Sequence, residues 1–191
     1  MSNEGAFISK LFQFKASKSV LKLAYATLFL LALGLRFTGI ENIQKPVFDE
    51  VYFPKFAYGY ITETPFFHSH PPFAKYLMAK GIRIYHALPW TDEPELGSQP
   101  FEKLNPASYR WVNALTGSLL CIVVALIAFR LSSSHLFSLL LMSFVVTDGS
   151  MLVASRFGLS NVHVLFWGAL SLYLALLTST TKRFWLYSAL T

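Results

Sequence analysis

The stretch "WVNALTGSLLCIVVALIAFRL", Trp111 to Leu131, decides the fold class of this chain. A membrane-spanning helix needs roughly 20 consecutive, mostly apolar residues, and this stretch carries no charged residue before Arg130. The chain as a whole has the same character. Of its 191 residues, 54% are hydrophobic and 14% are charged, against about 25% charged residues in an average soluble domain. We therefore expect one all-α integral membrane domain.

Three further apolar stretches extend this prediction to about four transmembrane helices. They cover about residues 20–40, 135–153 and 161–178, beside 111–131. Residues 1–19 then form a cytoplasmic N-terminal segment, and residues 20–191 form the membrane domain. The first apolar stretch does not resemble a cleavable signal peptide, because Arg36 stands where a small-residue cleavage site would fall.

Lysine and arginine residues set the expected orientation, because they are enriched in cytoplasmic flanks. With four crossings, the basic flanks fall on one side, which we assign to the cytoplasm; they contain Lys10, Lys15, Lys18, Lys22, Arg130, Lys182 and Arg183. The long loop 41–108 is then extracytoplasmic, and its eight acidic and six basic residues show no positive excess. The connection from Asp148 to Ser160 lies on the same side.

The long loop is expected to contain helices of its own. Aromatic and basic residues alternate at helical spacing in residues 55–61 and 74–86. This pattern suits helices lying in the lipid headgroup layer, and it equally suits helices packed on the membrane domain. Residues 89–108 are rich in proline and acidic residues, which predicts irregular structure.

Two classes of protein are disfavoured. Cys121 is the only cysteine, so the chain can form neither an internal disulfide framework nor a cysteine-based zinc site. The net charge of +6 does not indicate nucleic-acid binding, because the basic residues flank apolar runs and form no groove-like group.

The adjacent carboxylates Asp49 and Glu50 follow the first expected span. Neighbouring side chains point about 100° apart on a helix and to opposite faces on a strand. The two therefore cannot flank one bond as a glycosidase pair does. One carboxylate could face a reaction centre while its neighbour holds the structure; alone, the pair is more typical of a helix start or a solvated cap.

The octet "HSHPPFAK", His68 to Lys75, could bind an anion. Proline suits the first turn of a helix, so a helix could begin at Pro72 and hold His70 at its N-terminus, with Lys75 one turn inside. Free backbone N–H groups at a helix N-terminus favour phosphate. The alternative is an ordinary helix start with surface histidines. Metal binding by His68 and His70 is weakly indicated, and dependence on a divalent metal stays open.

Ionisable residues interrupt the apolar sequence again in "TDGSMLVASRFGLSN", Thr147 to Asn161. Asp148 and Arg156 lie at or near membrane depth, where charged residues usually have a function and a partner. A mutual ion pair, or an Arg156 that reaches to the interface, explains them equally well. Arg36 is interpreted as an interfacial anchor. Arg110, at the start of the second span, could be either an anchor or a functional residue.

The expected topology places Asp49, Glu50, His70, Lys75 and Arg156 at one extracytoplasmic face. A carboxylate base, basic groups and surrounding aromatic residues form a sensible site for a lipid-linked phosphate substrate.

Four ordered motifs, "VFDEVYF", "HPPFAK", "YRWVNALTGSLL" and "DGSMLVASRFGLSN", resemble those of protein O-mannosyltransferases and their bacterial relatives. These are glycosyltransferases of the membrane-embedded C-type fold that use polyprenyl-phosphate sugars. The resemblance runs from about Arg36 to Leu170. It covers only the N-terminal part of the family's longer members, which implies a partial C-type glycosyltransferase fold.

The resemblance implies roles for particular residues. Asp49 matches the catalytic base for the acceptor hydroxyl, and Glu50 matches its acidic neighbour. His70 and Lys75 match the His-Pro-Pro motif with its lysine. Arg156 matches an arginine associated with the donor phosphate. Two substrate-binding positions complete the set: Asp148, from the Asp-Gly pair, and Asn161, which replaces an aspartate of eukaryotic members and can donate hydrogen bonds without acting as a base.

The expected function follows from the resemblance: transfer of a sugar, by analogy mannose, from a polyprenyl-phosphate carrier to a serine or threonine hydroxyl of an acceptor protein, or to a glycan. The expected location is the extracytoplasmic face of a bacterial plasma membrane, in contact with lipid. The alternative is a truncated or split, non-catalytic fragment whose C-terminal half a partner subunit would supply. A transporter or channel subunit is disfavoured, because no inverted repeat is visible.

Overall fold

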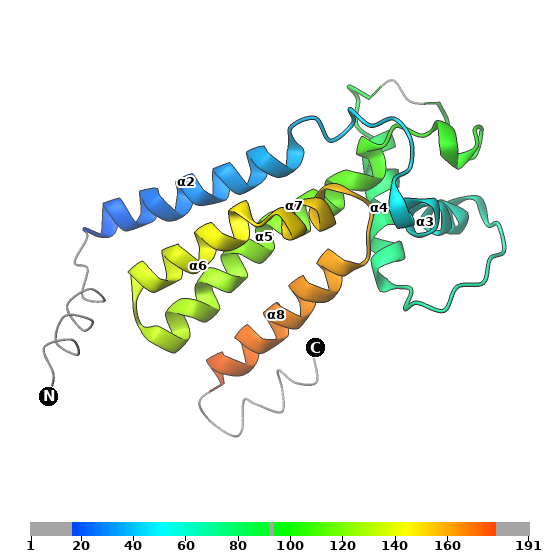
Figure 1. The fold of residues 1–191 in the computed structure, drawn as a ribbon. Coiled ribbons are helices and arrows are strands. Elements are labelled where there is room, and N and C mark those ends of the chain that lie inside the picture. Colours follow the sequence, from blue (N-terminus) through cyan, green and yellow to red (C-terminus); the bar gives the residue numbers. More distant parts are fainter. Residues whose placement is uncertain (1–16, 92–93, 179–191) are drawn as a thin grey trace, which may run out of the picture. The chain divides into compact units, whose positions relative to one another are not determined.

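The computed structural model describes residues 17–91 and 94–178, and the chain in these ranges is helical, without a strand (Figure 1). The helices are α2 (Lys18–Phe37), η1 (Phe48–Val51), α3 (Phe53–Thr62), α4 (Phe73–His86), η2 (Phe101–Lys103), α5 (Ala107–Ser132), α6 (His135–Thr147), α7 (Gly149–Arg156) and α8 (Asn161–Leu177). The chain divides into two compact units.

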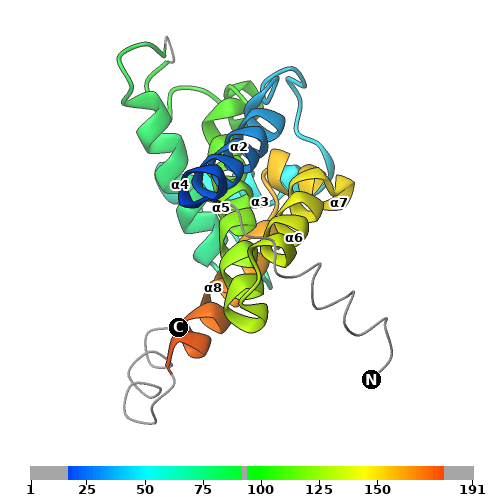
Figure 2. The ribbon, with the colours of Figure 1, turned by 90° about the vertical axis from the view of Figure 1, so that its left-hand side faces the viewer.

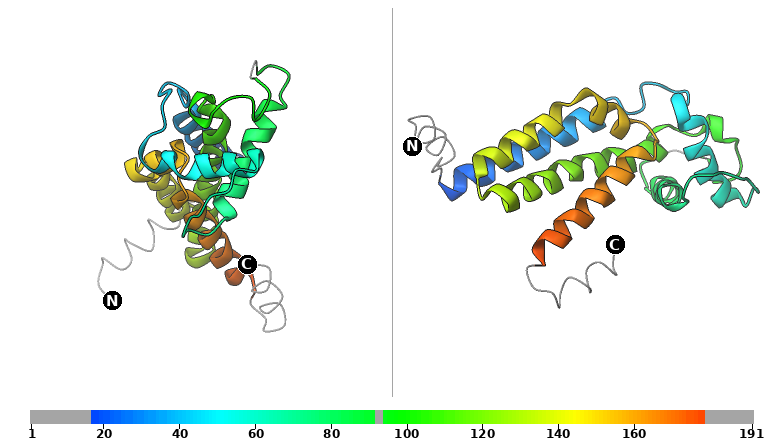
Figure 3. Two further views of the ribbon diagram at one scale, coloured as in Figure 1. Left: turned by 90° about the vertical axis from the view of Figure 1, so that its right-hand side faces the viewer. Right: turned by 60° about the horizontal axis from the view of Figure 1, so that its bottom comes forward.

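The first unit contains the described residues of 17–33, 118–148 and 165–178. The N-terminal part of α2, the C-terminal part of α5 and α6 run alongside one another in it (Figures 1 and 3). Their contact is built from small or slender buried residues, namely Ala32, Cys121, Ala125, Met142 and Val146. The Ser138 hydroxyl donates to the Ala125 carbonyl over 2.6 Å. Small residues and a serine hydrogen bond of this kind allow helices to approach closely in lipid.

Two helices of the described chain, α2 and α5, are long and apolar enough to cross a membrane. The helices α6 and α7 pass the same test only together, as a bent pair, and α8 is apolar but has 17 residues. Large apolar side chains such as Leu23, Leu30 and Val164 are mostly exposed, as lipid-facing residues are. The all-α membrane class is thus confirmed, whereas the number of crossings stays a prediction.

The stretch 135–153, which the sequence predicts as one span, is divided between two helices. The helix ends at Thr147, and Asp148 has an extended backbone, with φ −63° and ψ 123°. A separate helix begins at Gly149 and continues to Arg156. Asp and Gly are both poor residues for a helix interior, because the aspartate side chain competes for backbone hydrogen bonds and glycine loses the most conformational entropy.

The second unit contains residues 34–117 and 149–164, apart from 92–93. Helices α3 and α4 occupy the two stretches of the long loop in which helices were predicted, and they pack against each other (Figure 3). Figure 2 shows α4 along its length, followed by the loop that leads to α5. The core joins α3, α4, η2 and the start of α5; it contains Phe53, Ala57, Tyr58, Met78, Ala79, Ile82, Phe101, Leu104 and Tyr109.

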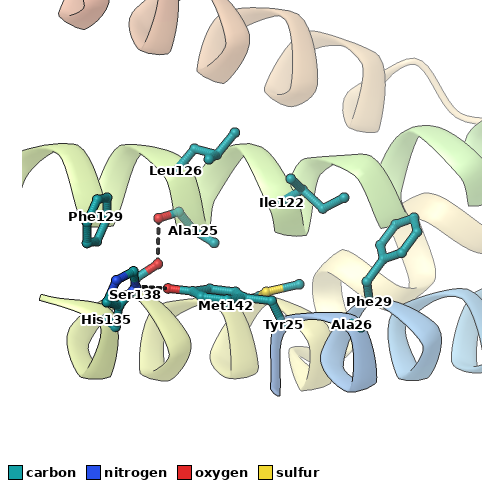
Figure 4. A pocket seen from close by; sticks show the side chains of 10 residues that line it. All are labelled: Tyr25, Ala26, Phe29, Ile122, Ala125, Leu126, Phe129, His135, Ser138 and Met142. Atoms are coloured by element: carbon teal, nitrogen blue, oxygen red, sulfur yellow. Dashed lines mark hydrogen bonds between the residues drawn. The ribbon is translucent and has the colours of Figure 1, made fainter. Parts of the chain in front are cut away.

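A cavity of about 390 Å³ opens among the helices of the first unit (Figure 4). It is lined by Tyr25, Ala26, Phe29, Ile122, Ala125, Leu126, Phe129, His135, Ser138 and Met142. In its wall, the Tyr25 hydroxyl lies 3.3 Å from His135 Nδ1. No lining residue is acidic, so the cavity offers a place for hydrocarbon and no carboxylate base.

Candidate active site

The acidic pair lies on the short helix η1, which turns its two carboxylates in different directions. Phe48 has a φ of +51°, a left-handed conformation that costs a non-glycine residue roughly 1–3 kcal/mol. Directly after it, Asp49 is exposed, while Glu50 is fully buried. The two neighbouring carboxylates therefore differ in their exposure to solvent.

Glu50 forms a buried ion pair with Arg110, from the first turn of α5. Arg110 Nη2 lies 2.7 Å from Glu50 Oε2, and Arg110 Nε lies 2.8 Å from Oε1. The backbone N–H groups of Val47 and Gly158 also donate to this carboxylate, over 2.9 and 2.7 Å. Glu50 thus accepts four hydrogen bonds, which matches the full capacity of a carboxylate.

Arg110 uses its remaining N–H groups on the backbone that leads to η1. Nη1 donates to the carbonyls of Ile40 and Ile43, over 2.9 and 2.8 Å, and Nη2 donates to the carbonyl of Lys45, over 3.2 Å. All five N–H groups of a guanidinium are then satisfied. Because the same side chain holds both Glu50 and residues 40–45, it positions the turn that presents Asp49.

The octet at His68 forms a compact group of His68, His70 and Lys75, called here the histidine cluster. The Lys75 ammonium donates to His68 Nδ1 over 3.2 Å and to the His70 carbonyl over 3.0 Å. The His70 backbone N–H also points to His68 Nδ1, at 3.3 Å. The two imidazole rings are stacked, with centroids 4.7 Å apart, and Phe53 meets both edge-on.

Burial and charge control the titration of this cluster. Lys75 is 2% exposed, and its burial lowers the pKa of its ammonium group below the ordinary value. Burial is also the main reason that the pKa of His68 is lowered; the positive charges of Lys75 and His70 lower it further, whereas Asp49 raises it. The Asp49 carboxylate thus acts electrostatically on His68, as the smallest of these four effects.

The expected start of α4 needs a small revision. The helix begins at Phe73, with Pro72 as the flanking residue, one position later than predicted. His70 is exposed, whereas Lys75 is buried under the two rings. Lys75 therefore contributes positive charge from below the surface, and His70 is the exposed member of the cluster.

Arg156 lies at the C-terminal end of α2. Its Nη1 donates to the Leu35 carbonyl over 2.5 Å, and its Nη2 donates to the Thr38 carbonyl over 2.8 Å. The last carbonyls of a helix lack partners within the helix, so an arginine is well suited to bind them. Half-buried Arg156 thus connects α7 to α2 and brings its charge to the chain that precedes Asp49.

Arg36 does not serve as the interfacial anchor that the sequence predicted. It is 1% exposed, and its Nε donates to the Ser155 hydroxyl over 3.1 Å. Gly117 of α5 permits this contact, because a Cβ atom there would lie 2.3 Å from Ser155 Cβ. Within its apolar stretch of sequence, Arg36 could be an interfacial anchor or a buried residue with a polar partner. The close approach of Gly117 to Ser155 shows that the buried arrangement forms.

Two polar residues of the site, Asn113 and His163, were missed from the sequence. Asn113 Nδ2 donates to the carbonyls of Phe157 and Leu159, over 2.8 and 2.7 Å, and Asn113 Oδ1 lies 3.0 Å from His163 Nε2. Both side chains are buried, whereas the predicted Asn161 is exposed at the start of α8. The available signal was the spacing of Asn113, which follows Arg110 by three residues and so shares its helix face.

Asp148 lies apart from the other predicted site residues in the division of the chain into units. Asp148 caps α6 in the first unit and is exposed, while the other predicted site residues belong to the second unit. Within residues 17–91 and 94–178, no three His, Cys, Asp or Glu side chains form a group that could hold a metal ion.

The fold and this site define a helical membrane protein whose second unit presents the exposed Asp49 and the histidine cluster. The family model described as "dolichyl-phosphate-mannose-protein mannosyltransferase" matches residues 26–191. The chain belongs to this family, as the resemblance of its motifs predicted.

Individual relatives agree with this assignment. Protein O-mannosyltransferase 1 of Drosophila melanogaster is 34% identical over 140 residues, which cover 73% of this chain and 16% of the relative. The polyprenol-phosphate-mannose–protein mannosyltransferase of Corynebacterium glutamicum is 28% identical over 158 residues, 74% of this chain and 27% of the relative. Dolichyl-phosphate-mannose–protein mannosyltransferase 4 of Candida albicans is 56% identical over 50 residues, 26% and 7% of the two chains. The chain thus spans less than a third of the length of these relatives, and no solved structure matches it significantly.

Proposed function

We propose that the second unit provides the acceptor-activating part of a mannosyltransferase site. In this reaction, mannose passes from a polyprenyl-phosphate carrier to a serine or threonine hydroxyl of a protein. The observation that carries the proposal is the contrast between exposed Asp49 and fully bonded, buried Glu50. One carboxylate is free to meet a substrate, and the other is committed to holding the turn.

Asp49 is proposed as the general base. Its carboxylate accepts the proton of the acceptor hydroxyl while the hydroxyl oxygen forms a bond to the anomeric carbon of mannose. The bond between that carbon and the phosphate oxygen breaks, and the polyprenyl phosphate leaves with the electron pair. Because this leaving group is already a stable phosphate, a single base is sufficient. Glu50 and Arg110 are proposed as positioning residues for Asp49.

Cationic groups are proposed to stabilise the charge that develops on the phosphate. Exposed His70 would contact the donor, and buried Lys75 would add positive charge beneath it. Arg156 would also stabilise the donor phosphate, through its positive charge and through the guanidinium N–H groups that do not bind the carbonyls of Leu35 and Thr38. Asn161, exposed at the start of α8, is proposed as a further substrate-binding residue, and the same role for Asp148, in the first unit, stays a prediction from the sequence.

The site is proposed to face the extracytoplasmic side of the membrane. The lysine and arginine distribution of the sequence supports this orientation. The bacterial plasma membrane remains the expected location. The matched relatives include insect, fungal and bacterial proteins, so they do not favour one kind of membrane.

The direct test is mannose transfer in proteoliposomes. The chain is supplied with polyprenyl-phosphate-mannose and a peptide containing serine and threonine, and both turnover and donor affinity are measured. We expect Asp49→Asn to lower kcat by about 100-fold or more while the donor Kd changes little, as for loss of a general base. Glu41→Gln removes another exposed carboxylate of the same unit and is the matched control.

One outcome would contradict the base role of Asp49, and another would favour the fragment alternative. Equal loss of turnover and donor affinity in Asp49→Asn would argue against a base. Donor binding without transfer by the unmodified chain, followed by transfer after addition of a C-terminal partner, would support the fragment alternative.

A further inference from the structure

Helix α4 has a buried inner face and an exposed outer face. The inner face packs against the rest of the second unit. Met78 and Ile82 are fully buried and belong to the core of the second unit. The indole Nε1 of Trp111 donates to the Gly81 carbonyl over 3.1 Å, so α5 lies directly against this side of α4. A Cβ atom on Gly81 would approach Val112 Cγ2 to 2.3 Å. The inner face is therefore already occupied by the protein.

The outer face of α4 consists of Phe73, Tyr76, Lys80, Arg83 and Ile84. These positions are spaced by three, four, three and one residues, which places them on one side of a helix with 3.6 residues per turn. All five are exposed, and the three apolar or aromatic side chains are 47–50% exposed. A helix that packed on its own unit only would show polar residues here, so the apolar outer residues indicate a further partner.

A groove of about 380 Å³ runs along this outer face. Tyr60 and Ile61 of α3 form one side of it, and Phe73, Tyr76, Lys80 and Arg83 of α4 are among the residues on the other. The rings of Tyr60 and Tyr76 meet within the groove, with centroids 4.6 Å apart. The groove therefore joins an aromatic floor to two cationic side chains.

The charge of the groove is of one sign. None of its lining residues is acidic, and helix α4 contains no Asp or Glu. Neither Lys80 nor Arg83 forms an ion pair with another residue in the part of the chain that the structure describes. Aromatic rings beside basic side chains suit the headgroup layer of a membrane, where the rings meet hydrocarbon and the cations meet lipid phosphate.

We propose that the α3–α4 groove binds the headgroup of an anionic phospholipid from the surrounding bilayer. The lipid phosphate lies between Lys80 and Arg83, and the first part of the hydrocarbon covers Phe73 and Tyr76. This surface is distinct from the histidine cluster, whose Lys75 lies on the buried side of the same helix. The assignment does not depend on the mannosyltransferase proposal.

The test measures lipid binding to the purified chain in detergent micelles. A fluorescent label that senses polarity is attached to Ala87→Cys, just past the end of α4, in a chain that also carries Cys121→Ala. Soluble short-chain phosphatidylglycerol is titrated against phosphatidylcholine of the same chain length. We expect a saturable spectral shift with phosphatidylglycerol, and about 30-fold weaker binding by Lys80→Gln/Arg83→Gln, from roughly 1 kcal/mol for each basic residue at an anionic surface.

Two variants make the result specific. Lys45→Gln/Lys103→Gln removes the same charge at exposed positions of the same unit and should bind within about twofold of the parent chain. Lys80→Arg/Arg83→Lys keeps the charge and should preserve binding. Circular dichroism confirms that each variant retains its helices.

Four results would overturn the proposal. The first is an equal shift with phosphatidylcholine, and the second is equal weakening by the Lys45/Lys103 control. The third is full binding by Lys80→Gln/Arg83→Gln. The fourth is the same shift with inorganic phosphate or an acidic peptide in place of lipid, which would make the groove a site for a soluble anion.

Discussion

Glu50 and Arg110 form a doubly bonded ion pair from which solvent is excluded: Arg110 Nη2 and Nε lie 2.7 and 2.8 Å from the two oxygens of the Glu50 carboxylate. Sixty residues separate the two in the sequence. The pair joins the turn that carries Asp49 to the first helical turn of α5, and through Gly158 it reaches the loop before α8. The exposed acid is therefore held by a buried one.

Removal of one member of this pair should destabilise the protein strongly. Glu50→Gln or Arg110→Met leaves its partner buried without a counter-charge, and such losses cost about 3–5 kcal/mol. The free energy of unfolding in detergent is the measurement. The surface pair Lys55–Glu102, with more than half of each side chain exposed, is the matched control. Lys55→Gln should cost less than about 1 kcal/mol, and equal costs for the two pairs would contradict this account.

Gly117 should tolerate no larger residue. A Cβ atom there would lie 2.3 Å from Ser155 Cβ, so Gly117→Ala forces the two backbones apart and should cost about 1–3 kcal/mol, as overpacked interiors do. Gly34, whose Cβ position meets nothing within 4 Å, is the control, and Gly34→Ala should be neutral or stabilising. Thermal unfolding compares them. Ser155→Gly should partly rescue Gly117→Ala, and a double variant with fully additive losses would show that the two residues do not meet.

Stability should rise with pH in the range just below the ordinary histidine pKa of 6.5. The folded chain lowers the pKa of His68, mainly through burial, so the unfolded chain binds a proton there more readily. The free energy of unfolding therefore falls as the pH drops below about 6.5. His68→Gln should flatten this dependence while retaining an acceptor for Lys75. Unfolding measured between neutral and mildly acid pH tests the point, and parallel curves for parent and variant would exclude His68 as the cause.

The predicted orientation can be tested by labelling in intact cells. In a Cys121→Ala chain, Glu63→Cys after α3 should react with a membrane-impermeant maleimide, because the lysine and arginine distribution puts loop 41–108 outside. Ser133→Cys, between α5 and α6, should react only after the membrane is permeabilised. Both positions are exposed, so access to the thiol is not limiting. The reverse pattern would move the proposed site to the cytoplasmic side.

Helix positions were the most predictable part of the fold. Long apolar runs can satisfy their backbone groups in lipid only as helices, so α2 and α5 follow directly from the sequence. The break at Asp148 was harder to place, because apolar residues occur on both sides of it, as far as Val153. For the predicted site residues, the motifs did not show that Lys75 is buried while His70 is exposed.

What the sequence by itself determined is the all-α membrane class, the family, and the presence of a paired acid followed by a His-Pro-Pro motif. These properties depend on local composition and order along the chain. The tertiary structure alone decided which acid is free, because Glu50 is withdrawn by Arg110 and by the backbone of Gly158, both distant in sequence. It also made Arg36 a buried partner of Ser155. A charged side chain excluded from water must find its partners in space, and sequence spacing does not show which residues those are.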